Sequence, residues 1–160
     1  TVAQKMLAPL APAGRQYYIK AQYMRDISVN AIDTMVDHFK KVTSPLSAMI
    51  FQQLGNAANR VSSGDTAFGH RDGVYSWEVF SAWEDPGESE IHVRWAREFA
   101  EAMLPYTNGF YVNHVGTEAE EGANVIRDAY GANFDRLASV KQKYDPANLF
   151  SHNQNIRPRR

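Results

Sequence analysis

A phenol, an amide and an imidazole stand close together in the short segment Tyr111-Val112-Asn113-His114. If the segment is a strand, Tyr111 and Asn113 lie on one face, because successive side chains of a strand point to opposite sides. A weak acid and a hydrogen-bonding amide would then share one wall. The plainer alternative is that tyrosine is simply favoured in strands and that Asn113 bonds a neighbouring backbone group. The segment alone leaves both interpretations open.

Other familiar chemical motifs are missing or weak. There is no cysteine, no GxGxxG loop and no GxxxxGK[ST] loop, so neither a thiolate site nor a phosphate cradle is visible. The segment Phe68-Gly69-His70-Arg71 could be only a loop whose arginine pairs with a carboxylate. Five histidines lack HxH or HxxxH spacing, so we expect no metal site: His38, His70, His92, His114 and His152. His38 is expected on the polar side of its helix.

Composition bounds the class of protein. The 160 residues are 44% hydrophobic and 22% charged, which is typical of one globular domain. A net charge of -1 offers no excess of cations for nucleic acid or an anionic membrane, so neither is expected as a partner. No apolar run approaches the roughly 18 residues of a membrane span. Residues 1–15, with two prolines, are interpreted as a linker or truncated edge, and the compartment is left undecided.

The chemistry-bearing residues must be positioned by a mixed set of elements. Period-two and aromatic-rich runs predict strands, whereas apolar residues at spacings of three and four predict helices. The expected strands cover 16–25, 46–54, 73–83 and 110–115, with 57–61 continuing a strand or forming a short hairpin arm. The expected helices begin at Ser28 and near Ile91, and a third ends at Asp145-Pro146. This order predicts an α+β fold, an antiparallel or mixed sheet with helices on one side.

The C-terminus carries the most specific pattern. The residues RLASVKQKYDPANLF from Arg136 to Phe150, followed by Asn153-Gln154-Asn155-Ile156, resemble the closing signature RLxxvKxkYDPxNlFxxxQxI of the berberine bridge enzyme-like family of FAD-linked oxidases. Further matching fragments follow in the same order as in that family: Thr66 to Arg71, Trp83, Tyr111 to Asn113, and Tyr130-Gly131. The resemblance covers most of the chain from Gln16 onward.

The resemblance implies a fragment of a flavoprotein. It suggests that 16–145 form the substrate-binding domain and that 146–160 form a tail packing on an N-terminal FAD domain of the same protein. FAD would be bound mainly by that domain, and this chain alone would be inactive. The turn formed by Asp145, Pro146 and Asn148 is expected to be architectural, with Phe150 anchoring the tail. Homo-oligomerisation could cover apolar sheet surface left without its partner.

The resemblance also assigns roles to individual residues. The family's usual base carries over to Tyr111, which would remove a proton while a small-molecule hydroxyl, or less often an amine, is oxidised by hydride transfer to flavin. Asn113 would contact substrate and cofactor, and Asn153 cofactor. Gln52 and Tyr75 are weaker substrate-binding candidates. His114 departs from the tyrosine common in the family, so further substrate contacts are not carried over.

Two other functions remain as alternatives. A free-standing α+β module that binds a ligand or dimerises could share this scaffold without redox chemistry. A metal-dependent hydrolase built on the histidines is kept only nominally. A gene that encodes an upstream flavin domain would favour the oxidase, and a stoichiometric metal would favour the hydrolase.

Overall fold

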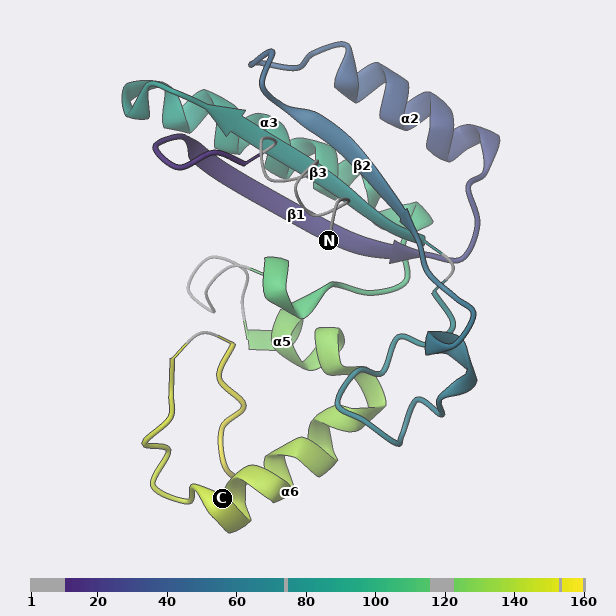
Figure 1. Cartoon of the computed structure of the whole chain (residues 1–160), viewed down its shortest axis with the longest axis vertical. Coiled ribbons are helices and arrows are strands. Elements are labelled where there is room, and N and C mark those ends of the chain that lie inside the picture. The colour runs from purple at the N-terminus through teal and green to yellow at the C-terminus, as the bar shows by residue number, and fades with distance from the viewer. Residues whose placement is uncertain (1–10, 74, 116–122, 153, 160) are drawn as a thin grey trace.

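The core of the chain is a three-stranded antiparallel sheet with two helices on one face (Figure 1). The computed structural model describes residues 11–73, 75–115, 123–152 and 154–159. The strands are β1 (Gln16–Met24), β2 (Ala48–Gln53) and β3 (Tyr75–Trp83), in the order β1-β3-β2. The covering helices are α2 (Val29–Phe39) and α3 (Ser89–Met103). The expected α+β class, with helices on one side of an antiparallel sheet, is confirmed.

Local sequence signals set the helix ends. The hydroxyl oxygen of Ser28 accepts a hydrogen bond from the Ala31 amide at 3.2 Å, which caps the first turn of α2 as expected. Pro105 lies just beyond α3 and can donate no backbone hydrogen bond, so the chain tightens there into the 3₁₀ turn Leu104–Tyr106. Two further helices, α5 (Ala123–Tyr130) and α6 (Phe134–Tyr144), form the C-terminal part, beyond the β1 edge of the sheet (Figure 1).

The hydrophobic core lies between the sheet and its two helices. Its largest fully buried side chains are Trp77, Phe99, Met24 and Met103. Each contributes about 1.5–3 kcal/mol by leaving water. We expected His38 on the polar side of α2, but its ring faces this core and stacks on Phe99 with centroids 5.3 Å apart. The polar side of α2 is therefore partly covered near the end of the helix.

The opposite side of the sheet, which we term the distal face, is turned away from α2 and α3. Register places Tyr23, Ser76 and Gln52 in one row across β1, β3 and β2. The neighbouring row contains Ala21, Glu78 and Ile50. Polar side chains of the three strands therefore gather on one band of the distal face, because residues paired across a sheet share a face.

A short segment adds to the outer edge of β1. The Asn108 amide donates to the Tyr23 carbonyl at 2.8 Å, and the Tyr111 amide donates to the Ala21 carbonyl at 3.1 Å. Gln22 and Phe110 form the bridge between them. With this rudimentary fourth strand the spatial order becomes fourth-first-third-second, the arrangement of a βαββαβ unit. The segment that carries Tyr111 is thereby fixed beside the distal face.

Two local expectations were wrong. Residues 58–60 form a 3₁₀ turn, not a strand or hairpin arm. The expected strand 110–115 is reduced to the bridge at Phe110, followed by the 3₁₀ turn Val112–His114. Here the amide of His114 donates to the Tyr111 carbonyl at 2.9 Å, so the backbone satisfies its hydrogen bonds locally instead of continuing the ladder.

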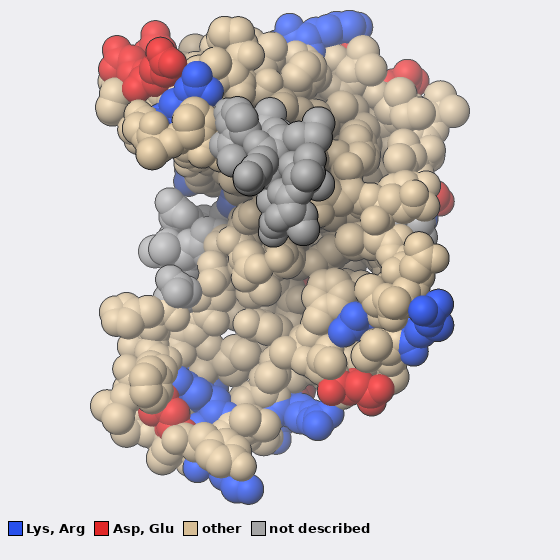
Figure 2. Space-filling model, in the orientation of Figure 1, with Lys and Arg blue, Asp and Glu red and all other residues tan. Residues whose placement is uncertain are grey.

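Charge is distributed without a dominant sign. Figure 2 shows Lys and Arg interspersed with Asp and Glu toward the periphery of the viewed face, with no continuous patch of one sign. This agrees with the net charge of -1. None of the described helices combines the length and the hydropathy that crossing a membrane requires.

Candidate active site

Tyr111 and Asn113 are brought together by a turn. The Asn113 side-chain amide donates to the Tyr111 phenol oxygen, with Nδ2 and Oη 2.8 Å apart. The expected contact between the two residues therefore exists, although strand alternation does not produce it. The pair therefore presents a phenol and an amide at one place, two groups that form hydrogen bonds with polar ligands.

Tyr23 extends the site from Tyr111 onto the distal face. It is only 3% exposed, and its ring meets the ring of Tyr111 edge-on with centroids 6.2 Å apart. Burial, followed by the charges of Tyr111 and Glu78, raises the pKa of Tyr23 well above its ordinary value. The neutral form of Tyr23 is therefore favoured at this place beside Tyr111.

Glu78 and Gln52 complete the polar band. Glu78 is 6% exposed, and one of its carboxylate oxygens accepts a hydrogen bond from the Gln52 side-chain amide at 2.9 Å. Sequence reasoning found Gln52 but missed Glu78 and Tyr23. Glu78 could have been noticed as the single acidic residue in the most aromatic strand. A carboxyl buried in a sheet needs a hydrogen-bond partner or has a functional role.

Tyr75 does not join this site. The register pairs it with Met24, and it packs against the hydrophobic core on the side of α2 and α3. Period-two alternation places it on the face opposite Ser76 and Glu78. Its predicted substrate contact therefore finds no support in the geometry.

The loop that carries His70 packs against Tyr23. The His70 ring stacks on Tyr23, with centroids 4.9 Å apart and planes at 28°, and its Nε2 bonds the Ala129 carbonyl at 3.0 Å. No described carboxylate pairs with Arg71, which differs from the simplest interpretation of this loop. Arg71 donates to the carbonyls of Phe68 and Ala58 and to the Thr66 hydroxyl. These hydrogen bonds stabilise the loop that packs against Tyr23.

The C-terminal turn is built on Asp145. Its carboxylate accepts hydrogen bonds from the amides of Leu149 and Phe150 at 2.8 and 3.0 Å and pairs with Lys141. The Lys141 hydrogen bond holds the pKa of Asp145 below its ordinary value. Farther on, the Gln154 side chain donates to the Val115 carbonyl at 2.7 Å, so the tail returns to the segment that follows Tyr111. Asn153, a predicted cofactor contact, lies outside the described residues.

No group of three or more histidine, aspartate or glutamate side chains that could hold a metal ion occurs within 11–73, 75–115, 123–152 and 154–159. His92 shows how one histidine is used instead. It is 3% exposed, stacks on Trp83, and its Nδ1 lies 2.8 Å from the Thr43 hydroxyl. This places it in the packing between α3 and the sheet.

Comparison with known proteins identifies the scaffold. The family model "Berberine and berberine like" matches residues 110–157, which include the Tyr111 turn and the Asp145 turn. An uncharacterized FAD-linked oxidoreductase, YgaK of Bacillus subtilis, is 38% identical over 137 residues, covering 85% of this chain and 30% of that protein. Tetrahydroberberine oxidase of Berberis wilsoniae is 28% identical, covering 92% of this chain and 31% of that protein. The chain belongs to the berberine bridge enzyme-like family.

Solved structures agree on the fold. The flavoenzyme CrmK of caerulomycin biosynthesis matches with a TM-score of 0.84 and 25% identity, over 99% of this chain and 36% of that one. Berberine bridge enzyme from Eschscholzia californica matches with a TM-score of 0.77 and 22% identity, over 91% of this chain and 33% of that one. The chain thus spans about a third of the length of its berberine bridge enzyme-like relatives.

The distal face fits the substrate side of a flavin site. It offers a phenol held by an amide donor, a buried carboxyl and a second phenol, groups that can bind a hydroxyl and hold its proton. The phosphate side has no counterpart, because the sequence contains no glycine-rich phosphate loop. The groups on the distal face therefore suit the substrate side of such a site and not its phosphate side.

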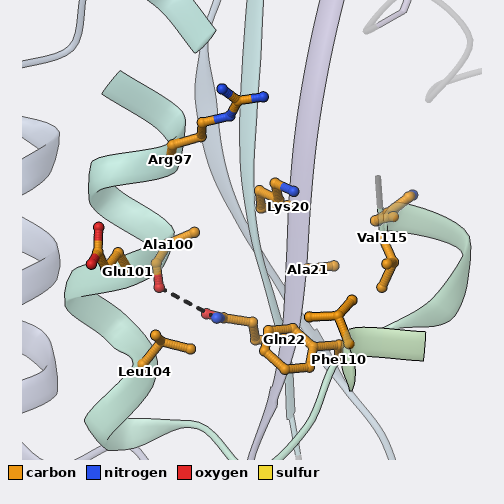
Figure 3. A pocket seen from close by; sticks show the side chains of 11 residues that line it. Lys20, Ala21, Gln22, Arg97, Ala100, Glu101, Leu104, Phe110 and Val115 are labelled. Atoms are coloured by element: carbon orange, nitrogen blue, oxygen red, sulfur yellow. Dashed lines mark hydrogen bonds between the residues drawn. The ribbon is translucent and has the colours of Figure 1, made fainter. Parts of the chain in front are cut away.

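A separate pocket of about 260 Å³ lies on the helix side of β1 (Figure 3). Gln22 is 2% exposed there and donates to the Ala100 carbonyl at 3.3 Å. Phe110 and Leu104 line its apolar part, whereas Tyr111 and Asn113 do not line it. A second pocket, of about 280 Å³, does include Asn113, with Tyr17 and Ile19 of the distal face beside it. The second pocket therefore adjoins Asn113 of the candidate active site.

Proposed function

We propose that this chain is the substrate-domain portion of an FAD-dependent oxidoreductase that oxidises a small-molecule hydroxyl, or less readily an amine. The observation that carries the proposal is the Asn113-to-Tyr111 hydrogen bond beside the polar band of the distal face. Family membership and the FAD-linked names of the relatives support the cofactor. In this proposal residues 16–145 bind substrate and 146–160 pack on the FAD domain.

In the proposed reaction the substrate loses two hydrogens, one from carbon as a hydride and one from oxygen as a proton. FAD, when bound, supplies the two-electron acceptor for the hydride. Tyr111 receives the hydroxyl proton, so an alcohol becomes a carbonyl compound. Asn113 donates to the Tyr111 oxygen and holds that oxygen in position for the transfer. Gln52 orients substrate from the far side of the band.

The first test is the cofactor content of the complete gene product. We expect a chain longer than 160 residues that shows the visible absorption bands of oxidised flavin. A colourless native chain of 160 residues would overturn the proposal and favour the free-standing binding module. The isolated 160-residue chain is expected to retain no FAD and no turnover, because it holds only the substrate-side wall.

The second test is Tyr111→Phe in the complete flavoprotein. Removing a general base costs about 10²–10⁴-fold in rate, so flavin reduction by an alcohol substrate found in a screen should fall by at least about 100-fold. Tyr106→Phe is the matched control, because Tyr106 packs against the core on the helix side. Flavin reduction at the wild-type rate in Tyr111→Phe would remove Tyr111 from the role of base.

A further inference from the structure

The pocket of about 260 Å³ on the helix side of β1 is formed by three parts of the chain (Figure 3). Gln22 of β1 forms one wall, and Ala100 of α3 with the adjoining Leu104 forms the second. Phe110 and Val115, from the segment beside the outer edge of β1, form the third. The lining includes none of the residues to which the proposed reaction assigns a role, so this pocket is distinct from the candidate active site.

A buried oxygen in this pocket has no hydrogen-bond partner among the described residues. Gln22 is 2% exposed, and its side-chain nitrogen donates to the Ala100 carbonyl at 3.3 Å (Figure 3). The oxygen of the same amide, Oε1, is buried and accepts no hydrogen bond within the described part of the chain. Buried amide oxygens are ordinarily satisfied, because leaving one without a donor costs free energy. The pocket therefore offers a place for one N–H or O–H group.

His114 brings a second polar atom of this kind. It lines the same pocket, and its Nδ1 is buried without a hydrogen-bond partner in the ranges that the structure describes. A ring nitrogen of histidine can donate or accept, depending on the tautomer. Two lining residues from separate segments thus each have a polar atom that a bound molecule could satisfy.

The charged residues of the pocket lie at its rim and have both signs. Arg97 and Glu101 are exposed, whereas Gln22 is buried. The Nε of Arg97 donates to the Tyr18 hydroxyl at 3.0 Å, and its guanidinium lies over the Tyr18 ring. The buried part of the lining therefore favours a neutral ligand, because a charge there would lose its hydration without gaining an opposite charge.

The size of the pocket limits the ligand. An apolar cavity of about 150 Å³ accepts benzene, and pockets for drug-sized ligands begin at about 300 Å³. A pocket of about 260 Å³ falls between these sizes. It therefore has room for one ring or two fused rings packed against Phe110 and Leu104.

We propose that this pocket is a second binding site, which takes a neutral molecule of one or two fused rings whose N–H or O–H group donates to Oε1 of Gln22. The aliphatic and aromatic lining contacts the rings, and the Gln22 oxygen selects molecules that have a donor. Binding involves no redox step, so this site does not depend on the proposed function.

The test compares two isomers by calorimetric titration of the complete protein. The isomers 3-methylindole and 1-methylindole have the same atoms, but only 3-methylindole has an N–H donor, and neither has a hydroxyl that could be oxidised. The Kd of 3-methylindole should be about tenfold lower than that of 1-methylindole, because one buried hydrogen bond is gained.

Variants locate the binding. Gln22→Leu should bring the ratio of the two Kd values to about one, because the oxygen is lost. Gln52→Leu is the matched control on the distal face and should leave the tenfold ratio unchanged. Leu104→Ala removes an apolar contact and should weaken both isomers alike. If Gln22→Leu does not fold, Gln22→Asn withdraws the oxygen by one carbon and should also remove the preference.

Three results would overturn the proposal. Absence of binding by either isomer would show that water or the rest of the complete protein fills the pocket. Equal Kd values in the unaltered protein would show that the Gln22 oxygen selects no donor. A preference that is retained in the Gln22 variants, or lost in Gln52→Leu, would place the binding elsewhere in the protein.

Discussion

At the scale of single residues, the carboxylate of Asp145 is the organiser of the C-terminal turn. It is bonded by two backbone amides and by Lys141, and the Lys141 ammonium also donates to the Phe150 carbonyl at 2.6 Å. Charge-assisted bonds of this kind are stronger than neutral ones. One side chain therefore holds the start of the tail against the end of α6.

This predicts a specific pH dependence. The folded pKa of Asp145 is depressed below 3.8, so its contribution to stability is complete above the unfolded pKa and disappears as pH falls through the folded value. Hydrogen exchange at the Leu149 and Phe150 amides, corrected for the intrinsic rate, should show protection near neutral pH that is lost below pH 3.8. Asp145→Asn should remove the protection at every pH.

Asp135→Asn is the matched control for this measurement. Asp135 also lies on α6, but its ion pairs with Arg127 and Arg159, each at 3.4 Å, are exposed and worth little. It should leave both amides protected. Protection that survives in Asp145→Asn would show that packing of the tail, and not the carboxylate, holds the turn.

The same scale shows why part of the site was hidden in the sequence. Tyr111, Asn113 and Gln52 were predictable from motif and strand assignment. Glu78 and Tyr23 were not, because their meeting depends on the register of β1 against β3, which no local pattern specifies. The strand pattern likewise does not specify which face of the sheet Tyr75 occupies, and the structure packs it against the hydrophobic core.

At the scale of elements, the 108–111 segment depends on the absence of a side chain at Gly109. Its φ of +153° is a conformation that glycine adopts most readily, and a Cβ there would lie 2.3 Å from Cε1 of His70. Gly109→Ala should therefore displace the His70 ring from Tyr23 and shift the segment that carries Tyr111. Both the free energy of unfolding and the turnover of the complete protein should fall.

Gly131→Ala separates strain from the steric clash. Gly131 has a φ of +54°, and a Cβ there would have no atom within 4 Å. Gly131→Ala should lower the free energy of unfolding by about 1–2 kcal/mol, the cost of a left-handed backbone for alanine, and turnover should be retained. Gly109→Ala should cost more in urea unfolding. Equal losses for the two variants would show that His70 moves aside freely.

The three strands of the sheet and the two helices that cover it were predicted from the sequence. The strand expected at 110–115 is instead a bridge followed by a 3₁₀ turn. Strands β1 and β3 are long, aromatic and paired along nine residues, so local preference and tertiary pairing agree. The segment after Gly109 pairs with only a few residues of β1, and a local turn at Tyr111 competes successfully with the ladder. Local preference cannot decide such a short pairing.

At the scale of the whole molecule, the C-terminal part exposes large apolar side chains. Tyr144 is 73% exposed, Leu149 78% and Phe150 81%. Among the described residues, Phe150 is held through its backbone, because its amide donates to Asp145 and its carbonyl accepts from Lys141. Since the chain spans about a third of its relatives, we infer that the missing two thirds provide the surface on which these side chains pack.

This inference predicts that one double variant, Leu149→Ser with Phe150→Ser, improves the behaviour of the isolated chain but destabilises the complete protein. In the isolated 160-residue chain the variant should lower self-association on sedimentation, because it removes exposed apolar surface. In the complete protein it should lower the unfolding temperature and flavin retention, since burial of each side chain contributes about 1.5–3 kcal/mol.

Val36→Ser and Ile32→Ser on the exposed side of α2 serve as controls that should not affect flavin retention. Unchanged stability and flavin content in the complete protein would mean that Leu149 and Phe150 remain exposed there, and that the tail docks through its backbone alone.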